Sequence, residues 1–250
     1  MTNRTRIVSP QLYARVGGVL YLIIILAGLF GEVFVRATLI VPGDATATAH
    51  NIMGSELLFR SGVVGDLIMH VCDIPLTLIF YVLLRPVSRD LSLLGAGFSF
   101  LQTTILCANK LNLVTVLLLL GDANYLKAFD PNQLQALASL SLTLHEYSFG
   151  VGLIFFGVSC LVVGYLIFKS SYFPRTIGIL QIIARLCYLI NSLSQLLHPA
   201  LAEKMFPFIL LPAFIGELAT CLWLLVKGIN TSKWEERLRI GPIVEGPIRG

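Results

Sequence analysis

Long apolar runs separated by short polar stretches dominate the pattern of this sequence. An α-helix needs roughly 20 mostly apolar residues to cross a bilayer. Six runs satisfy this requirement, at residues 12–37, 61–84, 91–120, 139–168, 174–197 and 206–226. Because only helices and closed barrels satisfy the backbone inside a bilayer, we predict an all-α fold, a six-helix transmembrane bundle.

The first apolar run has a second interpretation, since the core of a secretory signal peptide is also apolar and N-terminal. The stretch at 16–31 is at the long end for such a core. Glu32 and Arg36 follow it, where a cleavage region has small and neutral residues. We therefore predict a retained helix, with a signal peptide as the alternative.

Lysine and arginine are distributed unequally among the polar stretches. The first, third, fifth and last stretches together carry twelve of the eighteen, and the second, fourth and sixth carry four. Lys110 and Arg185 lie inside the spans. Loops rich in these residues usually stay in the cytoplasm. The pattern predicts that the N- and C-termini are both cytoplasmic, which agrees with an even number of spans.

Two polar stretches on the predicted external side carry signals for short amphipathic helices. Asp44 precedes residues 45–60 and is a suitable N-cap. Asp130-Pro131 begins a second helix that can continue into the fourth span, with proline at its first position. We predict a single polytopic membrane domain at 1–230. Residues 231–250 are polar, contain two Gly-Pro pairs and are predicted to form a flexible cytoplasmic tail.

The composition agrees with a membrane location. Hydrophobic residues make up 56% of the 250 residues and charged residues 13%, against about 25% charged in a soluble domain. This excludes a soluble enzyme, a disordered chain and a nucleic-acid-binding domain, so the net charge of +4 reflects topology. All five cysteines lie in apolar runs, which is typical of buried thiols. No cofactor is predicted, because no phosphate, dinucleotide or haem motif occurs.

Short motifs recur in a characteristic order along the chain. The N-terminal half contains Gly17-Gly18 and Gly65-Asp66-Leu67, and the C-terminal half contains Gly152-Leu-Ile-Phe-Phe-Gly157 and Gly216-Glu217-Leu218. In this order and spacing, residues 10–230 resemble the bacterial membrane-protein family named domain of unknown function 4386. The resemblance implies a multi-pass protein of the bacterial cytoplasmic (inner) membrane. It brings no known activity, substrate or catalytic residue.

Nine ionisable side chains remain at membrane depth, namely Glu32, Asp66, His70, Asp73, Lys110, His145, Glu146, Arg185 and Glu217. An ionised side chain at the centre of a membrane helix costs about 2.5–3.5 kcal/mol. Asp66, His70 and Asp73 recur at i, i+4 and i+7 and therefore share one helix face. Arg185 and Tyr188 belong to a similar polar stripe on the fifth span. Such aligned groups face the interior of a bundle.

The predicted cytoplasmic halves of the spans, at 76–84, 91–101, 153–168 and 218–226, carry no charge. We therefore predict a polar cavity that opens to the external side and is closed by an apolar plug on the cytoplasmic side. We expect Lys110 and Arg185 to neutralise some of the acids Asp66, Asp73 and Glu217. The candidate ligand-binding residues are Glu32, Asp66, His70, Asp73, Asn109, Lys110, His145, Glu146, Arg185, Tyr188 and Glu217.

Three functions remain open at this point. The first is binding of a small molecule or ion in the cavity by a transporter or sensor. The second is an intramembrane metalloenzyme that uses Asp66, His70 and Asp73, whose side chains suit zinc or manganese, although no established zinc spacing is present. The third is a structural or accessory subunit. The predicted partners are the lipid bilayer and a small-molecule or ion ligand, without nucleic acid.

Overall fold

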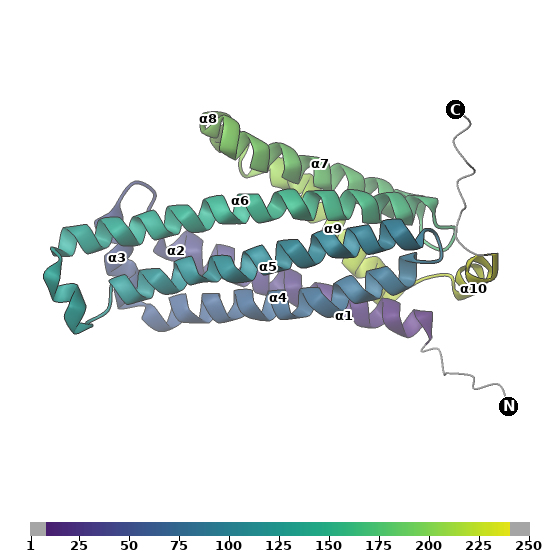
Figure 1. Ribbon diagram of the computed structural model, residues 1–250, viewed down its shortest axis with the longest axis horizontal. Helices are drawn as coiled ribbons and strands as arrows, with labels where there is room; N and C mark the ends of the chain where they lie inside the picture. The colour runs from purple at the N-terminus through teal and green to yellow at the C-terminus, as the bar shows by residue number, and fades with distance from the viewer. Residues whose placement is uncertain (1–8, 241–250) are drawn as a thin grey trace.

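Six long helices run side by side through the molecule, and the short helices that connect them lie toward one end (Figure 1). The computed structural model describes residues 9–240, which contain helices and no strand. The helices long and apolar enough to cross a membrane are Pro10–Leu39, Glu56–Leu84, Arg89–Leu119, Pro131–Lys169, Arg175–Leu197 and Phe208–Val226. The predicted all-α architecture with six candidate spans is therefore confirmed.

Several of these spans combine more than one element. The first comprises α1 (Pro10–Leu29), the π-helix η1 (Phe30–Arg36) and α2 (Ala37–Leu39). The next four are α4 (Glu56–Leu84), α5 (Arg89–Leu119), α6 (Pro131–Lys169) and α7 (Arg175–Leu197). The last comprises the 3-10 helix η3 (Phe208–Leu210) and α9 (Leu211–Val226). The connecting helices are α3 (Ala45–Gly54), the 3-10 helix η2 (Asn124–Ala128) and α8 (Pro199–Met205), and α10 (Thr231–Ile240) follows the last span.

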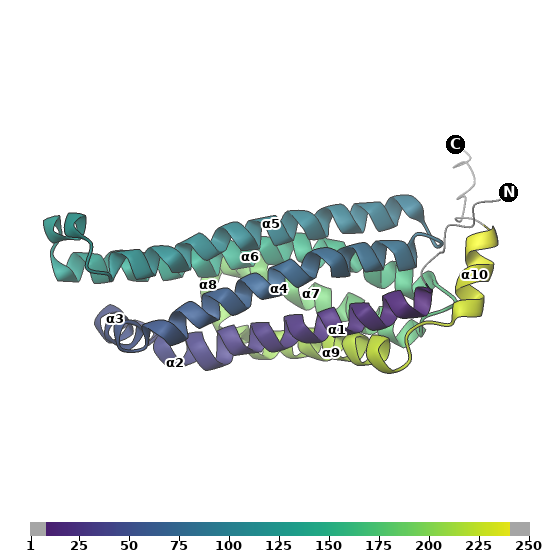
Figure 2. The same ribbon diagram turned by 90° about the horizontal axis from the view of Figure 1, so that it is seen from below.

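The six spans form a closed ring in which each packs chiefly against two neighbours. Around the ring the order is α1, α4, α5, α6, α7 and α9, and α9 returns to α1. In Figure 2, α1 and α9 lie on one side of the bundle, and α4 separates α1 from α5. We call the two ends of the bundle the α3 end and the α10 end, after the short helices found there (Figure 1).

The predicted helix signals at the α3 end are partly confirmed. The carboxylate of Asp44 accepts a hydrogen bond from the Ala47 amide at 2.8 Å and so caps α3. Asp130 caps α6, which begins at Pro131 and runs unbroken into the fourth span. The predicted single helix at 45–60 is wrong, because α3 ends at Gly54 and α4 begins at Glu56. The chain changes direction at Ser55, and residues 56–60 extend the second span.

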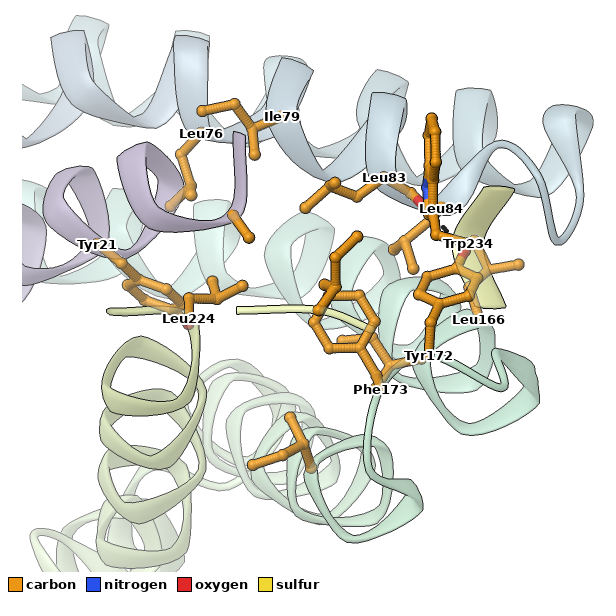
Figure 3. Packing of buried hydrophobic residues seen from close by; sticks show 14 of the residues in the cluster. Tyr21, Leu76, Ile79, Leu83, Leu84, Leu166, Tyr172, Phe173, Leu224 and Trp234 are labelled. Carbon is orange, nitrogen blue, oxygen red and sulfur yellow. Dashed lines mark hydrogen bonds between the residues drawn. The ribbon is translucent and has the colours of Figure 1, made fainter. Parts of the chain in front are cut away.

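An apolar cluster lies at the α10 end, and Trp234 of α10 belongs to it (Figure 3). The backbone carbonyl of Leu83 is one of the last four of α4, which have no partner within the helix. It accepts hydrogen bonds from the Tyr172 hydroxyl at 2.8 Å and from the Trp234 indole at 3.0 Å. Trp234 is 2% exposed. The prediction of a flexible tail is therefore wrong for residues 231–240, and residues 241–250 lie outside the described residues.

Candidate functional site

A buried ion cluster joins the first three spans in the half of the bundle nearer the α3 end. The Asp66 carboxylate accepts hydrogen bonds from Lys110 Nζ at 2.8 Å and from Arg36 Nη1 at 2.8 Å. Arg36 Nε also donates to Glu32 at 2.8 Å. We call these four residues the Asp66 cluster. Asp66 is 0% and Lys110 3% exposed, so the groups at the centre of this cluster are packed against one another.

The local backbone explains how Arg36 reaches Asp66. Residues Phe30–Arg36 form a π-helix, in which backbone hydrogen bonds join residues five positions apart instead of four. Gly31 lies directly opposite the Asp66 carboxylate, and a Cβ atom at position 31 would lie 2.6 Å from Asp66 Oδ1. The close approach of the two helices at the cluster therefore requires glycine at this position.

Two further candidate residues, Asn109 and His145, join α5 to α6 beside this cluster. Asn109 Nδ2 donates to the backbone carbonyl of His145 at 2.9 Å, and Asn112 donates to Asn109 Oδ1 at 2.9 Å. Both candidate residues are buried, at 3% and 5% exposure. The ring atom Nδ1 of His145 is buried without a hydrogen-bond partner among the described residues. The bond to the His145 carbonyl connects α5 to α6 and gives a packing role to the Asn109 side chain.

A second cluster lies near the middle of the bundle, on α1, α7 and α9. Arg185 Nη1 donates to the Glu217 carboxylate at 2.6 Å, and Arg185 Nη2 donates to Gln181 Oε1 at 2.6 Å and to the Tyr21 hydroxyl at 3.4 Å. The Tyr188 hydroxyl donates to Glu217 at 3.0 Å. We call these five residues the Arg185 cluster. The expected neutralisation by Lys110 and Arg185 is thus confirmed, with Asp66 and Glu217 as the partners.

Two aromatic rings also lie beside the Arg185 guanidinium. Its central carbon lies 4.5 Å from the ring centre of Phe156 and 5.4 Å from that of Tyr188. Such cation–π contacts stabilise a cation that has left water. With 1% exposure, Arg185 is a buried cation whose two terminal nitrogens both have partners.

The Arg185 cluster borders a partly open cavity of about 170 Å³ that residues from all six spans line. Most of the lining is apolar, with Leu76, Phe80, Leu106 and Leu153 as examples. The polar lining residues are Tyr21, Asp73, Thr77, Tyr81, Ser92, Ser99, Gln102, Ser159, Gln181, Arg185, Tyr188 and Glu217. The cavity extends from these mid-bundle groups to Leu84 and Ser92, toward the α10 end.

This location differs from the prediction of a cavity closed by an apolar plug at 76–84 and 91–101. Residues of the predicted plug line the cavity, because their hydroxyl-bearing and small side chains leave space between the apolar ones. Nearer the α3 end, by contrast, the polar side chains of the Asp66 cluster bind one another and fill the space between the helices. The single predicted polar cavity is thus replaced by one packed ion cluster and one separate cavity.

Asp73 is the acid of the second span that faces the cavity. Its side chain is 17% exposed, and its carboxylate lies 3.4 Å from His70 Nδ1. The other ring nitrogen of His70, Nε2, is buried without a partner among the described residues. Asp66 lies one helical turn away from His70 and forms ion pairs with Arg36 and Lys110. The predicted stripe on α4 therefore divides between two different environments.

The eleven candidate residues fall into distinct positions. Asp73, Arg185, Tyr188 and Glu217 line the cavity, whereas Glu32, Asp66 and Lys110 belong to the Asp66 cluster. His70, Asn109 and His145 are buried between helices. Glu146 is exposed on the outer surface of α6.

The candidate metal ligands do not come together. Within residues 9–240, no three His, Cys, Asp or Glu side chains are placed so that they could hold a metal ion. His70 and Asp73 are neighbours, but Asp66 faces two cations instead of the imidazole. The geometry therefore gives no support to a metal site formed by these three residues.

Three residues of the two clusters, Arg36, Tyr21 and Gln181, are absent from the candidate residues predicted from the sequence. Arg36 lies at the end of the first predicted span, 12–37, and is counted with the charges of the polar stretch that follows, whereas η1 and α2 continue the helix to Leu39. The spacing of Glu32 and Arg36, at i and i+4, was the available signal, since oppositely charged residues four apart pair on a helix. Tyr21 carried no signal, because a tyrosine in an apolar span has the same pattern as a packing residue.

Comparison with known proteins identifies the family. The model of a family described as "Domain of unknown function (DUF4386)" matches residues 16–228. The chain belongs to this family. An uncharacterized protein from Archaeoglobus fulgidus is 28% identical over 171 residues, which cover 68% of this chain and 86% of that relative. No solved structure matches the chain.

The family resemblance predicted from the sequence is thereby confirmed. The DUF4386 match includes both clusters and every residue that lines the cavity. It ends before α10, so Trp234 and its contact with Leu83 belong to a part of this chain outside the match.

Proposed function

We propose that this DUF4386 protein binds a small molecule in the cavity at the centre of its six-helix ring and acts as a transporter or sensor for it. The observation that carries the proposal is an internal space of about 170 Å³ with apolar walls and a charged cluster at one end. Ligand sites commonly combine mostly apolar walls with a few convergent polar groups.

The size of the space defines the size of the ligand. An apolar cavity of about 150 Å³ in another protein accommodates benzene. A ligand with one ring, or a short chain of similar volume, together with a small polar group therefore fits the volume between Leu153 and Phe80. Its polar group would face the Arg185 cluster and Asp73, and its apolar part would extend toward Leu84.

The experiment uses benzyl alcohol, which has one ring and one neutral polar group. We expect it to raise the unfolding temperature of the detergent-solubilised protein, since a ligand at ten times its Kd adds about 1.4 kcal/mol of stability. Ala96 lines the cavity, so Ala96→Leu should fill the space and abolish the effect.

Gly97, the next residue on α5, provides the control. It is exposed on the outer face, and a Cβ there meets no atom within 4 Å. Gly97→Leu adds similar bulk outside the cavity and should retain the response to benzyl alcohol. Equal responses in both variants would indicate adsorption to the outer surface. The absence of a response in the unsubstituted protein would favour a structural role for the polar groups.

We further propose that the protein lies in the bacterial cytoplasmic membrane with both termini in the cytoplasm. The support is the excess of lysine and arginine in the stretches on one side, twelve against four. Green fluorescent protein fused after Gly250 should fluoresce, whereas alkaline phosphatase at the same position should be inactive. Active phosphatase would reverse the orientation.

A further inference from the structure

The charge balance of the cavity wall indicates which ligands it accepts. Arg185 is the cation of this wall, and its two terminal nitrogens are bound by Glu217, Gln181 and Tyr21, whereas its Nε is buried without a partner among the described residues. The rings of Phe156 and Tyr188 lie beside the guanidinium. An anionic ligand that approached the terminal nitrogens would meet the Glu217 carboxylate, which already lies 2.6 Å from Nη1.

Asp73 is in the opposite situation. No lysine or arginine of residues 9–240 forms an ion pair with it, and its contact with His70 is long at 3.4 Å. The half-buried Arg36 and the buried Lys110 are both bound to Asp66. The cavity wall therefore carries one acid whose charge no fixed cation balances.

Four hydroxyl groups on the cavity wall already form hydrogen bonds within the protein. Thr77 and Ser99 bond to each other at 2.6 Å. Ser92 donates to the Tyr81 carbonyl at 3.1 Å, and Ser159 donates to the Gly95 carbonyl at 2.7 Å. Asp73 therefore remains the strongest acceptor that the wall offers, because a carboxylate accepts several hydrogen bonds and its present contact is weak.

Aromatic rings on the cavity wall add a second preference. Tyr21 and Phe80 form an edge-to-face pair with ring centres 6.5 Å apart, and both line the cavity, as do Tyr81 and Phe149. The ring faces of aromatic residues attract organic cations. A compact metal ion finds no set of oxygen ligands here, since no three metal-binding side chains meet among the described residues.

We propose that the ligand of this cavity is a small organic cation, a protonated amine on an apolar body, and that Asp73 binds its charged group. This inference rests on the proposed function and names its ligand class. The ammonium would donate to the Asp73 carboxylate, and the apolar body would pack among Phe80, Leu106 and Leu153.

Three probes, benzylamine, benzyl alcohol and benzoate, share one benzene ring with a one-carbon substituent and differ in the charge of the polar group. Isothermal titration calorimetry at about pH 7 compares their binding. The unsubstituted protein should bind benzylamine at least tenfold more tightly than benzyl alcohol, and benzoate most weakly. This ranking needs no variant, so it holds even where a substitution prevents folding. Tighter binding of benzoate or equal binding of all three probes would overturn the cationic preference and leave the cavity as a ligand site.

Asp73→Asn tests the assigned residue. Its affinity for benzylamine should fall at least tenfold while its affinity for benzyl alcohol stays unchanged. Glu146→Gln is the matched control, because Glu146 is an exposed acid that does not line the cavity, and it should bind benzylamine normally. Unchanged benzylamine binding by Asp73→Asn would overturn the role of Asp73. No binding of any probe to the unsubstituted protein would overturn the proposed function together with this inference.

Discussion

The Asp66 cluster and the Arg185 cluster contain the same kinds of charged side chains but differ in what surrounds them. Each holds buried arginine and a carboxylate at hydrogen-bond distance. Around Asp66 the space is filled by Lys110, Arg36 and the backbone at Gly31. The Arg185 cluster borders a cavity of about 170 Å³, and the nearby Asp73 lacks a fixed cation. Charge at membrane depth thus serves helix packing in one region and borders open space in the other.

The first prediction separates the two regions by their effect on stability. Asp66→Asn leaves Lys110 buried without an anion and leaves Arg36 with only the exposed Glu32, and removing one partner of a buried ion pair costs about 3–5 kcal/mol. Asp73→Asn should cost less than about 1 kcal/mol, because the remaining amide can still contact His70 across a weak hydrogen bond. Unfolding in detergent measures both values.

A double substitution checks the cause of this difference. Adding Lys110→Met to Asp66→Asn removes the cation that is left unpaired and should restore part of the lost stability. No recovery, or equal losses in Asp66→Asn and Asp73→Asn, would show that the two regions do not differ as described.

The second prediction concerns the tight packing at Gly31. Gly31→Ala would place a Cβ 2.6 Å from Asp66 Oδ1. The carboxylate or η1 must then shift, and such overpacking costs about 1–3 kcal/mol. Gly97→Ala is the control, because its added Cβ meets no atom within 4 Å. It should be neutral or stabilising in the same unfolding experiment, and a similar loss in both variants would refute the packing argument.

The difference between the regions could not be predicted from the sequence alone. Asp66 and Asp73 lie on one stripe of one helix, and periodicity correctly indicates that both face inward. Whether space remains beside each one depends on residues from other helices, such as Arg36 and Tyr21. Arg36 enters the first cluster through a π-helix, and sequence periodicity at 3.6 residues does not register this change of pitch.

The spans themselves were predictable because hydropathy alone determines them, and the capping residues Asp44 and Asp130 marked the starts of α3 and α6. The order of α10 was not predictable. Its sequence is polar apart from Trp234, Leu238 and Ile240, and a single buried indole that caps a distant carbonyl leaves no periodic signal.

The third and smallest effect is expected outside both regions, at Tyr172. Tyr172→Phe removes one of two hydrogen bonds to the Leu83 carbonyl. Because Trp234 still satisfies that carbonyl, the loss should be about 0.5–1 kcal/mol. It provides the scale of an ordinary buried hydrogen bond against which the loss in Asp66→Asn can be judged. A loss as large as that of Asp66→Asn would contradict this ranking.

The same residue gives a pH dependence. Burial raises the pKa of the Tyr172 phenol above its ordinary value of 10.0, against the opposing effect of Arg237. The folded protein therefore favours the neutral phenol, and this contribution to stability is complete below about pH 10 and is lost as the pH rises further. The stability difference between the unsubstituted protein and Tyr172→Phe should shrink above that pH. An unchanged difference in unfolding measurements up to about pH 11 would contradict the assignment.

The contact between Trp234 and Leu83 also sets an order for biosynthesis. The two residues are 151 positions apart, and a ribosome adds about 5–20 residues per second. The end of α4 is therefore synthesised roughly 8–30 s before the indole that completes it. Tyr172, the other partner of the Leu83 carbonyl, is synthesised 89 positions after Leu83 and therefore earlier than Trp234. The helix α10 thus completes the end of α4 only after the six described spans have been synthesised.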